Sequence, residues 1–257
     1  MFHARKDTIY PMRRTRILGL AVSLLLSLGA WAQTSPTVYL IPGTGGDHRL
    51  YDNLALQGYD TVRVHWVEPA PEDQMADLAQ RLLPQIDTTQ PHVLVGVSLG
   101  GMVATELATL THPEAVILIS SAKTREELPI RYRFQRQVPL YRWVGGQFLK
   151  DATPLGRFLF EPSSYPHRAV FNAMIDDKTP HFMEEGVRII CEWQRTEPPA
   201  VPTLHLHGSR DHTLPYRTIG EAQPIAKGSH MMVYTQGATV GATITNWLNQ
   251  TLVIENE

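Results

Sequence analysis

The sequence predicts an α/β fold: a doubly wound, mostly parallel sheet of about six strands with an inserted helical cap. Three observations predict it. Short apolar runs rich in β-branched residues alternate with segments of helical periodicity, which is the pattern of β-α-β units. One interval, 121–199, breaks this alternation and is far longer than an ordinary crossover connection. Finally, a glycine-rich turn joins the run 92–97 directly to the helical segment behind it.

The predicted strands share short length and β-branched, apolar composition. They are 37–41, 61–67, 92–97, 114–120 and 203–207, with 223–226 as a further candidate. Apolar residues at helical spacing predict the crossover helices 74–86, 99–110 and 238–248.

The first 32 residues have the order of a secretory signal, because basic residues precede an apolar run and a small-x-small site around Trp31. We expect cleavage before Gln33 and prefer it to an amino-terminal membrane anchor, since the apolar run is short for a span of about 20 residues. The remainder then divides into an α/β core, 33–120 and 200–257, and the cap insertion 121–199. We expect an exported protein, periplasmic or secreted, that is soluble after cleavage.

Composition excludes several classes of protein. A hydrophobic content of 43% with mixed charge is typical of a globular chain. The chain has 23 Lys and Arg against 25 Asp and Glu, and five of the basic residues but only one of the acidic residues precede Gln33. The expected mature protein is therefore acidic, and we expect no nucleic-acid partner. Cys191 is the single cysteine, so the fold can contain no internal disulfide.

The segment Gly96-Val97-Ser98-Leu99-Gly100 matches G-x-S-x-G at a predicted strand-to-helix junction. A serine on such a turn is held in a strained backbone and exposed above the sheet, and glycines are needed where a Cβ would crowd the turn. We predict Ser98 as the nucleophile and the N–H of Leu99 as an oxyanion donor. The alternative is a glycine-rich turn that simply begins a helix, and the context favours catalysis.

A serine nucleophile needs a general base and an orienting carboxylate. We predict His230 as the base, because it stands in a small-residue loop, KGSHMMVY, before the last helix. His212 is adjacent to Asp211 and is less able to bridge that carboxylate to the serine. His181 lies in the expected cap and precedes the acid. The alternative for His230 is an ordinary surface-loop histidine.

Asp211 is the predicted orienting acid, because it falls just beyond the carboxyl end of a strand, where open α/β sheets place functional groups. A turn-capping aspartate is the alternative. The surrounding stretch HLHGSRDH also resembles a metal site of the H-x-H-x-D-H kind. However, three residues rather than one separate the second histidine from the aspartate. His205 and His207 lie on a strand that we expect helices to cover on both faces. We therefore predict no metal and no cofactor.

The glycine-rich loop LIPGTGGDHRLY follows the first predicted strand and supplies the second oxyanion donor. The N–H of Thr44 is the first choice and that of Gly43 the second. A flexible turn before a helix is the alternative, and the position after the first strand favours the donor role.

With Ser98, Asp211 and His230 in that chain order, the sequence resembles the α/β-hydrolases over essentially the whole expected mature chain, and in particular small carboxylesterase and lipase-like members. The resemblance implies a serine triad, an oxyanion hole and a cap between the strands ending near Ser120 and beginning near Pro202. Two departures stand out: many relatives have His-Gly at Pro42-Gly43, and in the expected mature chain only the four residues 33–36 precede the first strand.

The expected reaction is hydrolysis of a small carboxylic ester with an apolar part, through an acyl-enzyme. The residues leave open a thioesterase, lactonase, peptidase or carbon-carbon hydrolase of the same fold, and also a ligand-binding receptor with a vestigial triad. Oligomeric state is not specified by the sequence.

The segment RYRFQRQVPLYRWVGGQFLK, within the expected cap, mixes basic and aromatic residues without an acid. It suggests either a surface for anionic substrate or lipid headgroups, or a solvated helix whose Tyr132, Phe134, Tyr141 and Trp143 pack on the core. We favour the packed helix, so that contact of the cap with a membrane surface is the lesser alternative.

Overall fold

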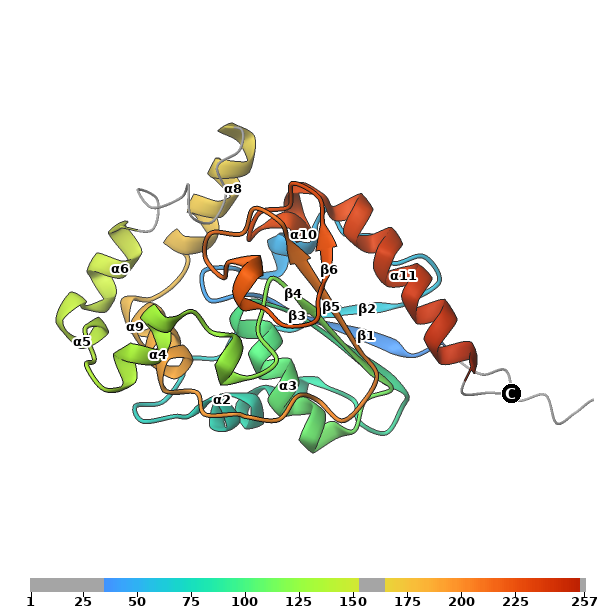
Figure 1. Cartoon of the computed structure of the whole chain (residues 1–257), viewed down its shortest axis with the longest axis horizontal. Coiled ribbons are helices and arrows are strands. Elements are labelled where there is room, and N and C mark those ends of the chain that lie inside the picture. Colours follow the sequence, from blue (N-terminus) through green and yellow to red (C-terminus); the bar gives the residue numbers. More distant parts are fainter. Residues whose placement is uncertain (1–34, 153–164, 255–257) are drawn as a thin grey trace, which may run out of the picture. The chain divides into compact units, whose positions relative to one another are not determined.

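The computed structural model describes residues 35–152 and 165–254, so the expected signal segment lies outside the described residues. In the described part, six parallel strands form one sheet in the order β2-β1-β3-β4-β5-β6 (Figure 1). The strands are β1 (Thr37–Ile41), β2 (Thr61–Arg63), β3 (His92–Val97), β4 (Ala115–Ile119), β5 (Thr203–Gly208) and β6 (Gln223–Ile225). The predicted parallel sheet is thereby confirmed.

The longer helices of the described residues connect and cover these strands. They are α2 (Met75–Leu82), α3 (Leu99–Thr111), α8 (Tyr165–Asp176), α9 (Pro180–Glu192) and α11 (Gly237–Ile254). Shorter helices include α4 (Ile130–Arg133), α5 (Tyr141–Val144), α6 (Gly146–Ala152) and α10 (Met232–Thr235). Single 3-10 turns occupy His48–Tyr51, Leu83–Gln85, Arg125–Glu127, Phe134–Arg136 and Tyr216–Thr218.

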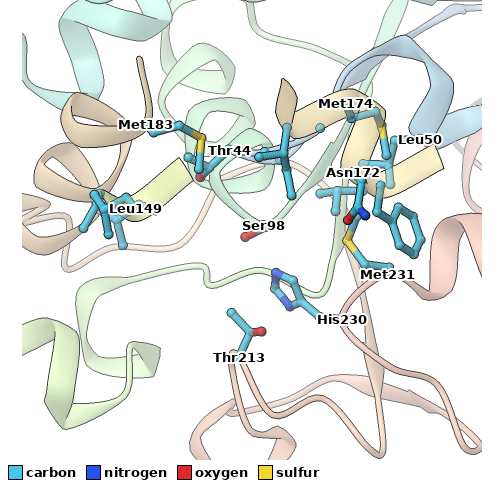
Figure 2. A pocket seen from close by; sticks show the side chains of 18 of the residues that line it. Thr44, Leu50, Ser98, Leu149, Asn172, Met174, Met183, Thr213, His230 and Met231 are labelled. Atoms are coloured by element: carbon cyan, nitrogen blue, oxygen red, sulfur yellow. The ribbon is translucent and has the colours of Figure 1, made fainter. Parts of the chain in front are cut away.

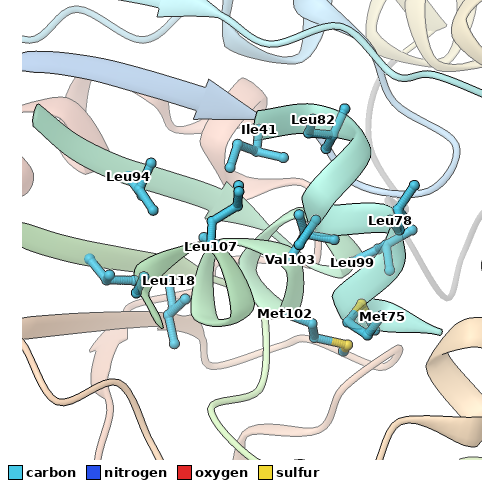
Figure 3. Packing of buried hydrophobic residues seen from close by; sticks show 14 of the residues in the cluster. Ile41, Met75, Leu78, Leu82, Leu94, Leu99, Met102, Val103, Leu107 and Leu118 are labelled. Atoms are coloured by element: carbon cyan, nitrogen blue, oxygen red, sulfur yellow. The ribbon is translucent and has the colours of Figure 1, made fainter. Parts of the chain in front are cut away.

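The strand residues are apolar at consecutive positions because both faces of the sheet are covered. In β3, Leu94 belongs to a core that includes α2 and α3, whereas Val93 and Val95 belong to a second core that includes α10 and α11. Figure 3 shows the first core, with side chains of α2 and α3 packed against the strands. The side chains of Val93, Leu94 and Val95 are all fully buried. The fold is therefore stabilised by apolar layers on both sides of the sheet.

Strand β2 ends at Arg63, four residues earlier than the sequence predicts. The amide group of Gln85 replaces the strand ladder at the next turn: its Oε1 accepts from His65 N at 2.8 Å, and its Nε2 donates to His65 O at 2.8 Å. Because the side chain satisfies both backbone groups, this edge of the sheet closes early.

The order of the strands creates a switch point between the neighbours β1 and β3. After β1 the chain continues to β2, toward one edge of the sheet, and after β3 it continues to β4, toward the other edge. Ile41 pairs with Gly96 in the register, so the loop after β1 and the turn after β3 leave the same edge of the sheet side by side. Ligand sites of open α/β sheets lie at such a crevice.

The described residues of the inter-strand segment, 120–202, contain the helices α4, α5, α6, α8 and α9. Hydrogen bonds of Arg125 hold the two ends of this segment together. The Arg125 N–H donates to Arg195 O at 2.8 Å, and its guanidinium donates to Trp193 O at 2.7 Å and Cys191 O at 3.2 Å. The described residues all belong to one compact unit, so the division into core and cap stays a prediction.

The aromatic residues of the inter-strand segment divide into two groups. Tyr141 is buried and donates to Glu192 Oε1 at 2.7 Å, and Tyr132 packs against the first core. Phe134 is 53% exposed and Trp143 is 81% exposed. The prediction that all four pack on the core is therefore wrong for Phe134 and Trp143, because the short helices turn only part of each amphipathic surface inward.

Candidate functional site

Ser98 lies between β3 and α3 in a backbone conformation that side chains rarely adopt, with φ 54° and ψ −121°. Its neighbours leave no room for a side chain. A Cβ on Gly96 would lie 2.2 Å from the carbonyl oxygen of Gly100, and a Cβ on Gly100 would lie 2.2 Å from that of Ile41. The two glycines therefore permit the sharp turn that lifts the Ser98 side chain above the sheet.

The backbone of Ser98 is held by the neighbouring strand β4 and the residues behind it. Ser98 N–H donates to Ile119 O at 3.1 Å, and Ser121 Oγ donates to Ser98 O at 2.7 Å. A Cβ on Gly101 would lie 2.4 Å from that Ser121 oxygen. No local pattern in the sequence indicates Ser121, since only the pairing of β3 with β4 brings it beside the turn.

Asp211 and His230 form a buried pair. His230 Nδ1 lies 2.8 Å from Asp211 Oδ2, and both residues are 4% exposed. The other carboxylate oxygen, Oδ1, accepts from the N–H groups of Thr213 and Leu214 at 2.8 Å each. Burial alone would raise the pKa of Asp211, but the electrostatic interaction with His230 and the hydrogen bonds from His207 and His230 outweigh burial and lower it. Asp211 is therefore a buried carboxylate that accepts two backbone N–H groups through one oxygen and contacts the His230 ring through the other.

A second imidazole approaches the same carboxylate. His207 is fully buried, and its Nε2 lies 2.7 Å from Leu214 O and 3.3 Å from Asp211 Oδ2. Both neighbours are acceptors, so Nε2 carries the proton. His207 Nδ1, left as an acceptor, lies 3.4 Å from His205 Nε2. The sequence pattern indicates these two histidines only as possible metal ligands.

His205 completes this row of imidazoles. Its Nε2 also lies 3.2 Å from Ser121 O, an acceptor, so the proton is on Nε2. Burial and the neighbouring His207 lower the pKa of His205 to about 3, which keeps the ring neutral. Among the residues that the structure describes, no group of three or more His, Cys, Asp or Glu side chains is placed to hold a metal ion.

The loop after β1 lies directly against Ser98, since a Cβ on Gly43 would be 3.3 Å from Ser98 Cβ. The Gly43 carbonyl accepts from Trp66 Nε1 at 3.1 Å and from Gly46 N at 3.0 Å. In a trans peptide the C=O and the following N–H point in opposite directions, so the Thr44 N–H points away from Trp66. The N–H of Leu99 lies in the first turn of α3, where amides lack intrahelical partners.

These groups open onto a pocket of about 320 Å³. Ser98, His230, Gly43 and Thr44 line one part of it, and Figure 2 shows the imidazole of His230 turned toward the Ser98 hydroxyl. The rest of the lining is mainly apolar and comes from the loop after β1 and from helices α6, α8 and α9. These apolar residues include Leu50, Leu149, Phe171, Met174, Ile175, Met183, Val187 and Ile190.

A family model described as the alpha/beta hydrolase family matches residues 38–242. The chain belongs to this family. The match includes the loops after β1 and β3 and the positions of Ser98, Asp211 and His230. The six-stranded parallel sheet is that of the α/β-hydrolase fold. A comparison with curated proteins finds no match.

Solved structures share the α/β-hydrolase fold at low identity. An esterase from Thermogutta terrifontis is 20% identical with a TM-score of 0.64, over 85% of this chain and 91% of that one. A hydrolase from Pseudomonas aeruginosa is 18% identical with a TM-score of 0.65, over 86% and 91% of the two chains. The enol-lactonase from Burkholderia xenovorans is 17% identical with a TM-score of 0.63, over 86% and 94%.

Within this α/β-hydrolase, the three histidines that the sequence offers as the general base, His230, His212 and His181, have different surroundings. His230 meets Asp211 inside the pocket wall. His212 is exposed, and His181 Nε2 lies 3.0 Å from Pro69 O, away from the carboxylate. The geometry therefore favours His230 over both alternatives.

Proposed function

We propose that this α/β-hydrolase is a serine hydrolase that cleaves carboxylic esters through an acyl-enzyme intermediate. Ser98 is the nucleophile, His230 the general base and Asp211 the orienting acid. One observation carries the proposal: His230 Nδ1 meets a buried carboxylate at 2.8 Å while the same ring turns toward a serine on a strained turn. A neutral serine hydroxyl needs this assistance to attack a carbonyl at neutral pH.

In the proposed reaction Ser98 Oγ attacks the ester carbonyl carbon and its proton passes to His230 Nε2. The N–H groups of Leu99 and Thr44, with Gly43 as the second choice, stabilise the oxyanion. The imidazolium then returns the proton to the leaving alcohol, and a water molecule repeats the sequence to release the acid. Asp211 keeps the ring in the productive tautomer throughout.

The lining of the pocket supports an apolar acyl or alcohol group in the substrate. Most of the residues from α8 and α9 are aliphatic, methionine or aromatic, and such a lining favours apolar ligands. We propose that the inter-strand segment acts as the cap predicted over 121–199. One of the similar structures is a lactonase and another an esterase, and lactones are cyclic esters, so the substrate panel should contain both kinds.

The test is labelling by a fluorophosphonate together with hydrolysis of p-nitrophenyl esters of increasing acyl length. Ser98→Ala should abolish both signals, whereas Ser209→Ala, a change at an exposed serine outside the pocket, should leave both intact. A lactone and a matched thioester then identify the preferred bond. A folded wild-type protein that neither labels nor turns over any of these compounds would instead support a ligand-binding protein.

We also propose that residues 1–32 are a secretory signal and that the enzyme acts after export. Amino-terminal sequencing of the protein recovered from the periplasm or medium should begin at Gln33. Recovery of an uncleaved chain from the membrane fraction would support an anchor instead.

A further inference from the structure

Exposed apolar side chains concentrate in one short part of the chain. The large hydrophobic residues that the structure describes as exposed lie mostly between positions 130 and 148, and only Val62 and Leu110 lie elsewhere. Those in this interval are Ile130 (75% exposed), Phe134 (53%), Val138 (37%), Leu140 (43%), Trp143 (81%) and Phe148 (62%). Together with Arg136 and Arg142 they form what we term the basic-aromatic face. Clusters of exposed apolar residues on a soluble fold mark interaction sites.

The packing of the short helices explains why this face points outward. Helices α4, α5 and α6 and the 3-10 turn after α4 all contact α9, which buries Ile189 in the core. Tyr141 in α5 and Gly146 in α6 are buried, so part of each of these helices already packs inward. The exposed residues of these short helices and the turns between them take no part in that buried packing.

The charge of this segment is one-sided. Positions 131–150 carry five basic residues and no acid, although the chain as a whole has more acidic than basic residues. Arg131 and Lys150 donate to backbone carbonyls, and Lys150 Nζ meets Asp176 O at 2.7 Å. Arg136 and Arg142 are exposed, and the carboxylate found near Arg142, that of Glu192, is 3.9 Å away. Positive charge is thus available beside exposed aromatic rings.

We propose that the basic-aromatic face docks on the surface of an anionic lipid bilayer. Trp143 and Phe148 would enter the headgroup region, where amphipathic aromatic rings are stabilised, and Arg136 and Arg142 would meet lipid phosphates. This combination of a basic and an apolar surface on short helices is typical of interfacial binding. Within the described ranges no helix is long and apolar enough to cross a bilayer.

The location of the face gives the docking a consequence for the pocket. Tyr132 and Leu149 belong to the same short helices and line the pocket beside Ser98. A bilayer at the basic-aromatic face therefore lies next to one wall of the pocket. Docking itself does not depend on the proposed ester hydrolysis.

The experiment is sedimentation with vesicles of phosphatidylcholine alone or mixed with phosphatidylglycerol, at low and high salt. Wild type should bind the mixed vesicles and lose binding as salt rises. The double variant Arg136→Glu/Arg142→Glu should bind about tenfold or more weakly. The matched double variant Arg210→Glu/Arg217→Glu makes the same change of charge at exposed sites outside the face and should bind like wild type.

A second pair of variants tests the apolar contribution. Trp143→Ser/Phe148→Ser should lose vesicle binding, whereas Val62→Ser/Leu110→Ser, at the exposed apolar residues outside the face, should retain it. All variants carry the same amino terminus, so binding through residues 1–32 is common to them. Equal binding by all variants would overturn the proposal. So would a wild-type dimer that ignores vesicles and dissociates on Trp143→Ser/Phe148→Ser.

Turnover of a soluble short-chain ester keeps the two proposals separate. The four double variants should keep it, and far-ultraviolet circular dichroism checks their folding. Loss of vesicle binding with turnover intact supports docking as a distinct property. Absence of turnover in every protein, including wild type, would count against the hydrolase proposal and leave the binding result valid.

Discussion

His207 Nε2 lies 3.3 Å from Oδ2 of Asp211, the same carboxylate oxygen that His230 Nδ1 meets at 2.8 Å. One buried oxygen therefore faces two imidazoles, and only one of them faces the pocket. The N–H of His207 draws part of the carboxylate charge away from His230. We therefore expect His207 to act as a positioning residue for the proposed triad.

Replacement of His207 should alter the pH dependence of turnover. In His207→Leu the Asp211 charge is directed at His230 alone, so the acid limb of the kcat/KM profile should move to higher pH and kcat should fall about tenfold. His207→Gln, which can retain a donor, should lie closer to wild type. Asp211→Asn is the reference and should lower kcat about 10⁴-fold. Loss of stability in His207→Leu with an unmoved acid limb would show a structural role only.

Ser121 and Ser120 are neighbouring buried serines with different hydrogen bonding. Ser121 Oγ donates to the carbonyl of Ser98, whereas Ser120 Oγ has no hydrogen-bond partner in the structure. Ser121→Ala should lower the free energy of unfolding by about 1 kcal/mol and reduce kcat, because it releases the turn that carries Ser98. Ser120→Ala should change stability by less than about 0.5 kcal/mol. Urea unfolding and ester turnover of the pair measure the difference, and equal effects would contradict the role of Ser121.

Trp66 should support the proposed oxyanion hole through the Gly43 carbonyl. Trp66→Phe removes the indole N–H but keeps an aromatic ring against Phe182, whose ring centroid is 5.5 Å away. We expect kcat to fall about tenfold with KM nearly unchanged, since the loss is felt mainly in the transition state. Trp247→Phe, a change in the other core, is the control and should keep full activity. A fall confined to KM would instead place Trp66 in substrate binding.

The neutral His205 should make stability depend on pH. Burial lowers the pKa of His205 to about 3 from the ordinary value of 6.5, so between these values the unfolded chain binds a proton that the folded chain does not. The free energy of unfolding should therefore decrease as pH falls below 6.5, by up to about 1.4 kcal/mol per pH unit. His205→Gln should show a shallower decrease in urea unfolding at pH 6.5 and 5. An unchanged slope would mean that His205 is protonated in the folded state.

The sequence predicted the parts of the candidate site that depend on local pattern. The turn at Ser98 follows from two glycines between a strand and a helix, and Asp211 and His230 lie in loops next to predicted elements. Ser121 and Trp66 were not identified, because their contacts with the backbone of Ser98 and Gly43 depend on which strands are neighbours. Pairing of strands is a long-range property that a single sequence does not specify.

Other differences have equally specific physical causes. The strand expected over 61–67 is shorter because one amide side chain, Gln85, occupies both backbone groups of His65. Phe134 and Trp143 are exposed although their composition suggested packing, because apolar content does not reveal how many sides of a short helix find a neighbour. The order of the six strands and the position of Ser98 depended on neither detail.

The hydrogen bonds of Arg125 connect the beginning and the end of the inter-strand segment. Its hydrogen bonds to Arg195, Trp193 and Cys191 close the segment at its base. We expect these hydrogen bonds to keep the two strand ends in place whatever the conformation of the chain between them. We therefore expect substitutions of pocket-lining residues in this segment, such as Leu149 and Ile175, to change which substrates fit while the turn that carries Ser98 keeps its shape.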